Sequence, residues 1–173
     1  TSGSSGTSGS SGTSGTNGSS GTSGSSGASG PIGPYEYNTP GSTTSGIQPV
    51  SGSNVASGCL STIGGGETNN IGGAGVCSFI GSGCNNRIAE ASGTGALSSI
   101  VGGRSNTVSG SNSNIGGGDA NILESNFSII GGGRLNTIKN SADYSGIASG
   151  FQNIIPDLLG GNCNIFIGGG TLN

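Results

Sequence analysis

Isoleucine recurs along the second part of the chain at short, nearly regular intervals. With the chain aligned on these isoleucines, defined here as position 0, successive units are 17, 20, 15, 15, 17 and 20 residues long. A second aliphatic residue stands at position +8 in six units, and serine stands at position −2 in six of the seven. The pattern indicates a repeat in which two apolar residues per unit face a shared core. The residues at position 0 are Ile63, Ile80, Ile100, Ile115, Ile130, Ile147 and Ile167.

Between the two apolar positions, every unit has glycine at position +3 and asparagine at position +6. The glycines are Gly66, Gly83, Gly103, Gly118, Gly133, Gly150 and Gly170. The asparagines are Asn69, Asn86, Asn106, Asn121, Asn136, Asn153 and Asn173. We interpret both sets as corner residues, with glycine taking positive φ or admitting a neighbouring backbone. Asparagine tolerates positive φ, and its stacked amides can bond from one unit to the next.

A unit of this length is too short for two helices, and its glycines disfavour even one. We therefore predict an all-β C-terminal block, a β-solenoid of seven 15–20-residue repeats, with equivalent residues stacked about 4.8 Å apart. Position +4 offers a check on this register. Arg104, Asp119 and Arg134 become neighbours of alternating charge on the surface if the coils stack in this way.

Residues 1–33 place glycine at every third position from Gly3 to Gly33, with none out of phase. This predicts a collagen-like Gly-X-Y rod, because only glycine fits the axis of three wound polyproline-II chains. A flexible Gly/Ser linker, produced by duplication of a TSGSSG hexapeptide, is the alternative. Four threonines of the tract are candidate O-glycosylation sites that would stiffen it: Thr7, Thr13, Thr16 and Thr22.

The two repeats divide the chain into three parts. We expect a rod over 1–33, a neck over 34–58 with a short strand near residues 47–50, and the β-solenoid over 59–173. A coil with two large aliphatic residues buries little surface, so three chains side by side or interleaved as a triple β-helix would stabilise it. The Gly-X-Y tract demands the same number of chains. Both repeats therefore predict a homotrimer.

Composition excludes several classes of function. The chain has 41 glycines, no histidine, seven acidic and four basic residues, and a net charge of −3. Acid–base catalysis and His-containing zinc sites lack their usual residues, so we expect no enzyme, no catalytic residues, no metal site and no cofactor. Four scattered basic residues are too few for nucleic-acid binding. No apolar run reaches the roughly 20 residues that a membrane-spanning helix needs.

Cysteines and loops add two smaller predictions. Cys77 and Cys84 are candidates for a disulfide. Disulfides between chains around a threefold axis and small thiols stacked in the core are the alternatives. The 20-residue units insert residues near 91–97 and 155–162, which we interpret either as loops on one face that could bind a ligand or as simple variation in length.

The I-G-G-G-x-x-N-x-I units, seen at residues 63–71, 115–123 and 130–138, resemble repeats of viral and bacterial surface fibres. They are similar, more loosely, to the head repeats of trimeric autotransporter adhesins. Gly-X-Y tracts joined to β-rich C-terminal domains are likewise typical of phage tail fibres, giant-virus surface proteins and bacterial filaments. The resemblance implies a homotrimeric structural fibre at a cell or virion surface.

We therefore expect an extracellular protein whose main partner is itself, in a trimer that also joins further subunits end to end. The first alternative is an adhesin or receptor-binding tip that contacts a host or surface glycan. A spike enzyme that degrades polysaccharide is a second alternative, although no pair of carboxylates stands out for it.

Overall fold

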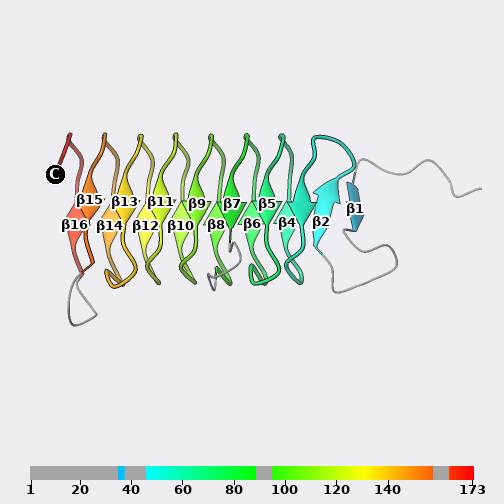
Figure 1. Cartoon of the computed structure of the whole chain (residues 1–173), viewed down its shortest axis with the longest axis horizontal. Coiled ribbons are helices and arrows are strands. Elements are labelled where there is room, and N and C mark those ends of the chain that lie inside the picture. The colour runs from blue at the N-terminus through cyan, green and yellow to red at the C-terminus, as the bar shows by residue number, and fades with distance from the viewer. Residues whose placement is uncertain (1–34, 38–45, 89–94, 158–163) are drawn as a thin grey trace, which may run out of the picture. The chain divides into compact units, whose positions relative to one another are not determined.

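The computed structural model describes residues 35–37, 46–88, 95–157 and 164–173. All regular elements in these residues are β-strands, and the chain winds into a parallel β-solenoid of about six turns (Figure 1), which confirms the predicted solenoid. No helix in this part of the chain could cross a membrane. The predicted Gly-X-Y tract lies outside the described residues.

Two sheets form the solenoid, and all their strands pair in parallel except β1. Each complete coil contributes one strand to each sheet. The nine-stranded sheet contains β1 (Tyr35–Tyr37), β2 (Ile47–Pro49), β4 (Thr62–Ile63), β6 (Phe79–Ile80), β8 (Ser99–Ile100), β10 (Asn114–Ile115), β12 (Ile129–Ile130), β14 (Gly146–Ile147) and β16 (Phe166–Ile167). The seven-stranded sheet contains β3 (Val55–Ala56), β5 (Asn70–Ile71), β7 (Arg87–Ile88), β9 (Thr107–Val108), β11 (Ile122–Leu123), β13 (Thr137–Ile138) and β15 (Ile154–Ile155).

Strands of successive coils pair in register within the same chain. Ile115 of β10, for example, pairs with Ile100 of β8 on one side and with Ile130 of β12 on the other. The backbone N–H of one coil donates to a carbonyl of the next, as from Gly116 to Ile130 at 2.9 Å. A unit of 15–20 residues is thus long enough to close a coil within one chain.

The core is a double ladder of aliphatic side chains between the two sheets. Position 0 supplies one side and position +8 the other, and these side chains are fully buried from Ile63 to Ile155. Ile167, the last residue at position 0, is only partly buried. The strands alternate, since the side chain before the buried isoleucine faces outward, as do Ile129 in β12 and Ile154 in β15. The core is therefore one side chain deep from each sheet, as the pattern of apolar positions predicts.

The solenoid begins earlier than the sequence indicates, inside the segment predicted to be a neck. β2 and β3 form a first coil in which Gln48 occupies position 0, because its neighbour Ile47 pairs with Thr62. The Gln48 side chain is buried, accepts a bond from the backbone N–H of Ala56 at 2.7 Å and donates to Glu36 at 3.3 Å. A polar residue thus ends the aliphatic ladder, which explains why a search for isoleucine missed this coil.

β1 runs antiparallel to β2 and covers the outer edge of the first coil. An uncovered edge strand exposes unpaired N–H and C=O groups that can recruit another chain. Tyr35 of β1 also donates its hydroxyl to the backbone carbonyl of Gly64 at 2.7 Å, which ties this strand to the second coil.

Candidate functional site

The sharpest local structure is the corner that follows each strand of the nine-stranded sheet. Glycine at position +3 has a positive φ in all seven units, between 84° in Gly66 and 115° in Gly150. From Gly66 to Gly150, a Cβ atom at this position would also collide with the backbone of the next coil, so both expected reasons for glycine hold in these six units. The middle glycines differ, because a Cβ on Gly65 or Gly132 would meet nothing within 4 Å.

The expectation that asparagine at position +6 takes positive φ was wrong. The left-handed residue is the one before it, at position +5, as in Ala120 (54°) and Leu135 (57°). Its N–H points back along the solenoid, so that Ala120 donates to the carbonyl of Arg104 at 2.9 Å. The N–H of Asp119 at position +4 points forward and donates to Gly133 at 3.0 Å. The left-handed residue therefore links each coil to the preceding one, whichever side chain it carries.

The asparagines at position +6 instead form a buried ladder through the solenoid. The side chains from Asn69 to Asn153 are fully buried. The Asn121 carbonyl oxygen accepts bonds from the backbone N–H of Asn136 at 3.0 Å and from its side-chain amide at 3.1 Å. The Asn121 amide nitrogen donates to Gly117 and Gly133 carbonyls at 3.0 Å and to Asn106 Oδ1 at 3.1 Å. The expected bonding between stacked amides is present, and one side chain joins three coils.

A second polar ladder runs along the opposite corner, where serine occupies position −2. Ser113 is buried, donates its hydroxyl to the carbonyl of Ser125 at 2.9 Å and accepts the N–H of Ser128 at 3.2 Å. The same bond recurs from Ser113 to Ser98 at 3.2 Å. These contacts satisfy polar groups that would otherwise be buried without partners, and they explain the serine preference found in the sequence.

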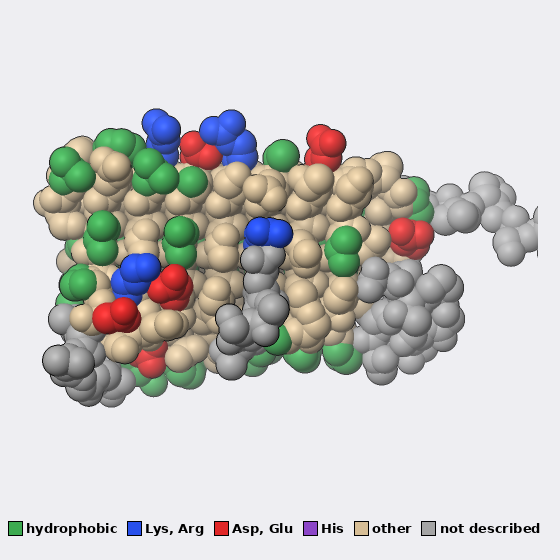
Figure 2. Space-filling view, in the orientation of Figure 1, with side chains coloured by type: hydrophobic (Ala, Val, Ile, Leu, Met, Phe, Trp, Pro, Cys, Tyr) green, Lys and Arg blue, Asp and Glu red, His purple; other side chains and the backbone are tan. Residues whose placement is uncertain are grey.

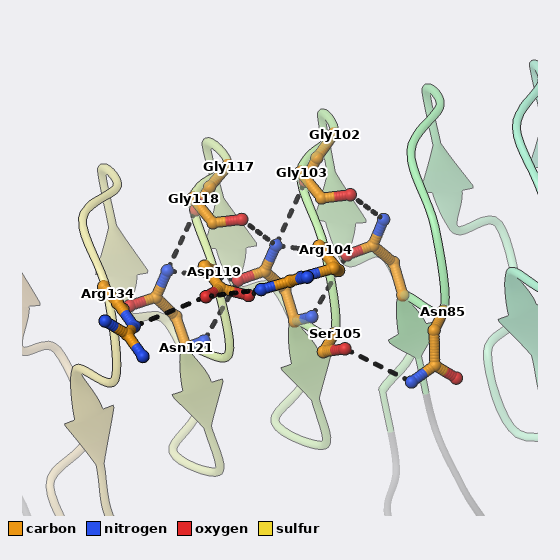
Figure 3. Close-up of polar contacts among 12 residues, drawn as sticks. Asn85, Gly102, Gly103, Arg104, Ser105, Gly117, Gly118, Asp119, Asn121 and Arg134 are labelled. Carbon is orange, nitrogen blue, oxygen red and sulfur yellow. Dashed lines mark hydrogen bonds and ion pairs between the residues drawn. The ribbon is translucent and has the colours of Figure 1, made fainter.

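The charged residues at position +4 lie on the surface in the order that the register predicts. Arg104 is bidentate to Asp119, with Nε at 3.0 Å from Oδ1 and an Nη at 3.1 Å from Oδ2. Arg134 approaches Asp119 from the other side at 3.4 Å (Figure 3), and its guanidinium lies 5.6 Å from the Phe151 ring centroid. Backbone bridges join this column from Glu67 to Thr171.

This contact shifts both titrating groups in the direction that stabilises the ion pair. The hydrogen bonds from Arg104 hold the pKa of Asp119 below its usual value, and the positive charges of Arg104 and Arg134 act in the same direction. The bonds to Asp119 likewise raise the pKa of Arg104. Because the pair is exposed, solvent screens it and it contributes little to stability.

Replacing Asp119 with asparagine is expected to lower the melting temperature by only about a few degrees. The loss should shrink in about 1 M salt, where the screening length is about 3 Å. The difference in stability between wild type and variant should also disappear as pH falls through the lowered pKa of Asp119, because Asp119 stabilises the fold only while its carboxylate is ionised. Thermal melts at two salt concentrations check this, with Glu67→Gln as the control. A loss unchanged by salt would contradict the electrostatic explanation.

Cys59 and Cys77 lie at the same corner of adjacent coils, where the backbone N–H of Cys77 donates to the carbonyl of Cys59 at 2.8 Å, whereas Cys84 lies in the column of position +4. Cys77 and Cys84 are exposed free thiols, and Cys59 is a half-buried one. The alternative of buried thiols is thus wrong for Cys77 and Cys84. The disulfide between these two is not formed either, since extended strand β6 separates the two corners that carry them. Cys163 lies outside the described residues.

Two further features bear on the candidate site. Most of the loops predicted near 91–97 and 155–162 lie outside the described residues, which exclude 89–94 and 158–163. Sequence reasoning missed the stacked pair formed by Phe127 and Tyr144, whose ring centroids are 5.0 Å apart with an interplanar angle of 5°. Both occupy position −3, where left-handed residues of mixed type leave no pattern to detect.

Within the described ranges, no three His, Cys, Asp or Glu side chains are grouped so that they could hold a metal ion. No protein-family model and no curated protein sequence matches this chain. The β-solenoid architecture, its two polar ladders and its surface columns are therefore the basis on which a function can be argued.

Proposed function

We propose that this chain is a structural subunit of a homotrimeric fibre at a cell or virion surface, in which the solenoid holds three chains together and sets the register of a collagen-like rod. One observation carries the proposal. Eleven glycines fall in strict triplet phase over 1–33, ahead of a repetitive β-domain. At about 3.1 Å per residue, such a rod would be about 100 Å long.

The thin core of the solenoid supports this proposal. From Ile63 to Ile155 each coil buries one aliphatic side chain from each sheet, while large apolar side chains such as Phe79, Ile129 and Phe166 remain at least two-fifths exposed. Association of chains would bury part of this surface. A proline-poor rod also needs a partner domain to bring three chains together, because little in its own sequence favours the extended conformation.

The full chain is expected to have three times the mass of one chain in solution and a polyproline-II-like circular dichroism signal that melts cooperatively. Gly15→Ala should lower or abolish that melt, because only glycine fits the axis of a collagen triple helix. Ser14→Ala, at the neighbouring position, should leave it unchanged. Light scattering and dichroism on the three proteins check this. A monomer without such a melt would make the tract a linker and remove the proposal.

An adhesive fibre tip is the second candidate, and the exposed stack of Phe127 and Tyr144 favours it. Both rings are about half exposed on the solenoid surface, and aromatic side chains are common anchors in recognition surfaces. A glycan array probed with the full chain and with the Tyr144→Ala variant would test this role. Binding that the substitution abolishes would favour a tip over a passive shaft.

A further inference from the structure

Apart from Glu36 of β1, whose carboxylate accepts a bond from the buried Gln48 at 3.3 Å, the charged residues of the described coils occupy one side of the solenoid. Among the described coils they stand at position +4, on the seven-stranded sheet, and in the segment that leads from this sheet to the next coil. They are Glu67, Arg87, Arg104, Asp119, Glu124, Arg134, Lys139, Asp143 and Asp157. Figure 2 shows basic (blue) and acidic (red) side chains along the upper edge of the solenoid and on the face turned toward the viewer. Both signs of charge occur there, as expected for a surface that remains in water.

The outer face of the nine-stranded sheet has no charged residue in the described coils. This face consists of positions −1 and +1, on either side of each buried isoleucine. Its residues are Ile47, Thr62, Phe79, Ser99, Asn114, Ile129, Gly146 and Phe166 at −1, with Pro49, Gly64, Gly81, Val101, Gly116, Gly131, Ala148 and Gly168 at +1. Depletion of charge together with exposed aromatic residues is the compositional mark of a protein interface.

Large, exposed apolar side chains recur along this face from the first coils to the last. Phe79, Val101, Ile129 and Phe166 are between 43% and 69% exposed. A Cβ on the buried Gly146 would lie 3.1 Å from the Phe166 ring and 3.3 Å from the Ile129 side chain. The ring and the isoleucine therefore flank Gly146 and join into one apolar patch, with the small residues of position +1 beside it.

The same sheet is the one that the N-terminal tract leads into. Gly33, the last glycine in phase, precedes Tyr35 by two residues, and Tyr35 begins β1 at the edge of the nine-stranded sheet. Three chains held together by the tract would thus enter their solenoids at this sheet. Two further copies of the chain are the occupants that both the tract and the uncharged face indicate.

We propose that the outer face of the nine-stranded sheet is the surface through which three copies of this chain associate, with the charged sheet turned to solvent. This inference rests on the proposed homotrimer and adds which side of the solenoid forms its interior. Exposed Phe79, Val101, Ile129 and Phe166 then become buried against the same face of the neighbouring copies, which removes apolar surface from water.

Two isoleucines provide a matched test on the full chain. Ile129 and Ile154 are 49% and 50% exposed, and each precedes a buried isoleucine in a two-residue strand, but on opposite sheets. Ile129→Lys is expected to lower the solution mass three-fold at a concentration where wild type is trimeric. Ile154→Lys should leave the mass unchanged. Far-ultraviolet circular dichroism verifies that each variant is folded, and Val101→Lys replaces Ile129→Lys if that variant does not fold.

The outcomes separate this inference from the function on which it rests. A trimeric wild type with a monomeric, folded Ile129→Lys and a trimeric Ile154→Lys supports the assigned face. Folded trimers of both variants, or dissociation of the Ile154→Lys variant, would overturn the face and leave the homotrimer standing. A monomeric wild type would overturn the homotrimer, and the interface with it.

Discussion

Asn121→Ala is expected to lower the free energy of unfolding by about 3–4 kcal/mol, or roughly 10 °C in melting temperature. The Asn121 side chain is fully buried, and its Oδ1 accepts the backbone N–H of Asn136 at 3.0 Å. Alanine leaves that N–H without an acceptor and removes the donor that reaches the carbonyl of Gly117 at 3.0 Å. A buried polar group that loses its partner costs about 1–3 kcal/mol.

An isosteric variant separates hydrogen bonding from side-chain volume. Asn121→Asp keeps the shape but has no N–H to donate, so a carboxylate oxygen would face the carbonyls of Gly117 and Gly133. We expect this variant to be at least as unstable as the alanine variant at neutral pH. Asn70→Ala serves as the control, since Asn70 lies on the outer face of β5. Thermal and urea unfolding of the three variants give the comparison. Equal stability of Asn70→Ala and Asn121→Ala would argue against the ladder.

Gly133→Ala is expected to destabilise the solenoid by about 3–5 kcal/mol. Gly133 has a φ of 86°, a conformation that costs an L-residue about 1–2 kcal/mol. An added Cβ would also press directly against the carbonyl oxygen of Gly150 and lie 2.7 Å from its backbone nitrogen and from the Asn136 amide. The backbone of two successive coils would have to separate to make room for it.

The neighbouring Gly132→Ala provides a control within the same run of glycines. Its φ is not positive, and an added Cβ meets nothing within 4 Å. We expect the melting temperature to stay the same or rise slightly, because alanine reduces the freedom of the unfolded chain. Comparable losses in both variants would mean that the corner glycines are not distinguished by φ and coil spacing.

The stacking register was predictable because several independent columns fix it. Isoleucine, glycine and asparagine recur at fixed offsets, and a shift of one residue would turn every isoleucine outward. Arg104, Asp119 and Arg134 then fall beside each other, and the structure pairs them through Asp119. Columns with a conserved spacing in one chain therefore carry enough information to place neighbouring coils.

Other features could not be predicted from the sequence, because the positions that form them do not require a particular residue type. The left-handed corners hold residues as different as Ala120, Leu135 and Tyr144, since the backbone hydrogen bond is what matters there and none of these side chains is buried. Gln48 ends the apolar ladder with hydrogen bonds in place of packing, so a hydrophobic pattern does not reach it. The role of Asn121 was predicted only in part: its side chain bonds to the neighbouring asparagines as expected, but its backbone does not take the positive φ of the corner.

Pairing only between adjacent coils has a consequence for how the chain reaches this structure. The hydrogen bonds of the asparagine ladder join residues 15 to 20 positions apart from one coil to the next. Closing loops of that length costs little entropy. Each closed coil then offers its free backbone N–H and C=O groups and its apolar side chains for the next coil to pair and pack with. Folding can thus start at any adjacent pair of coils and continue coil by coil in both directions. Asn121 and its neighbours set the register of each new coil as it packs on the previous one.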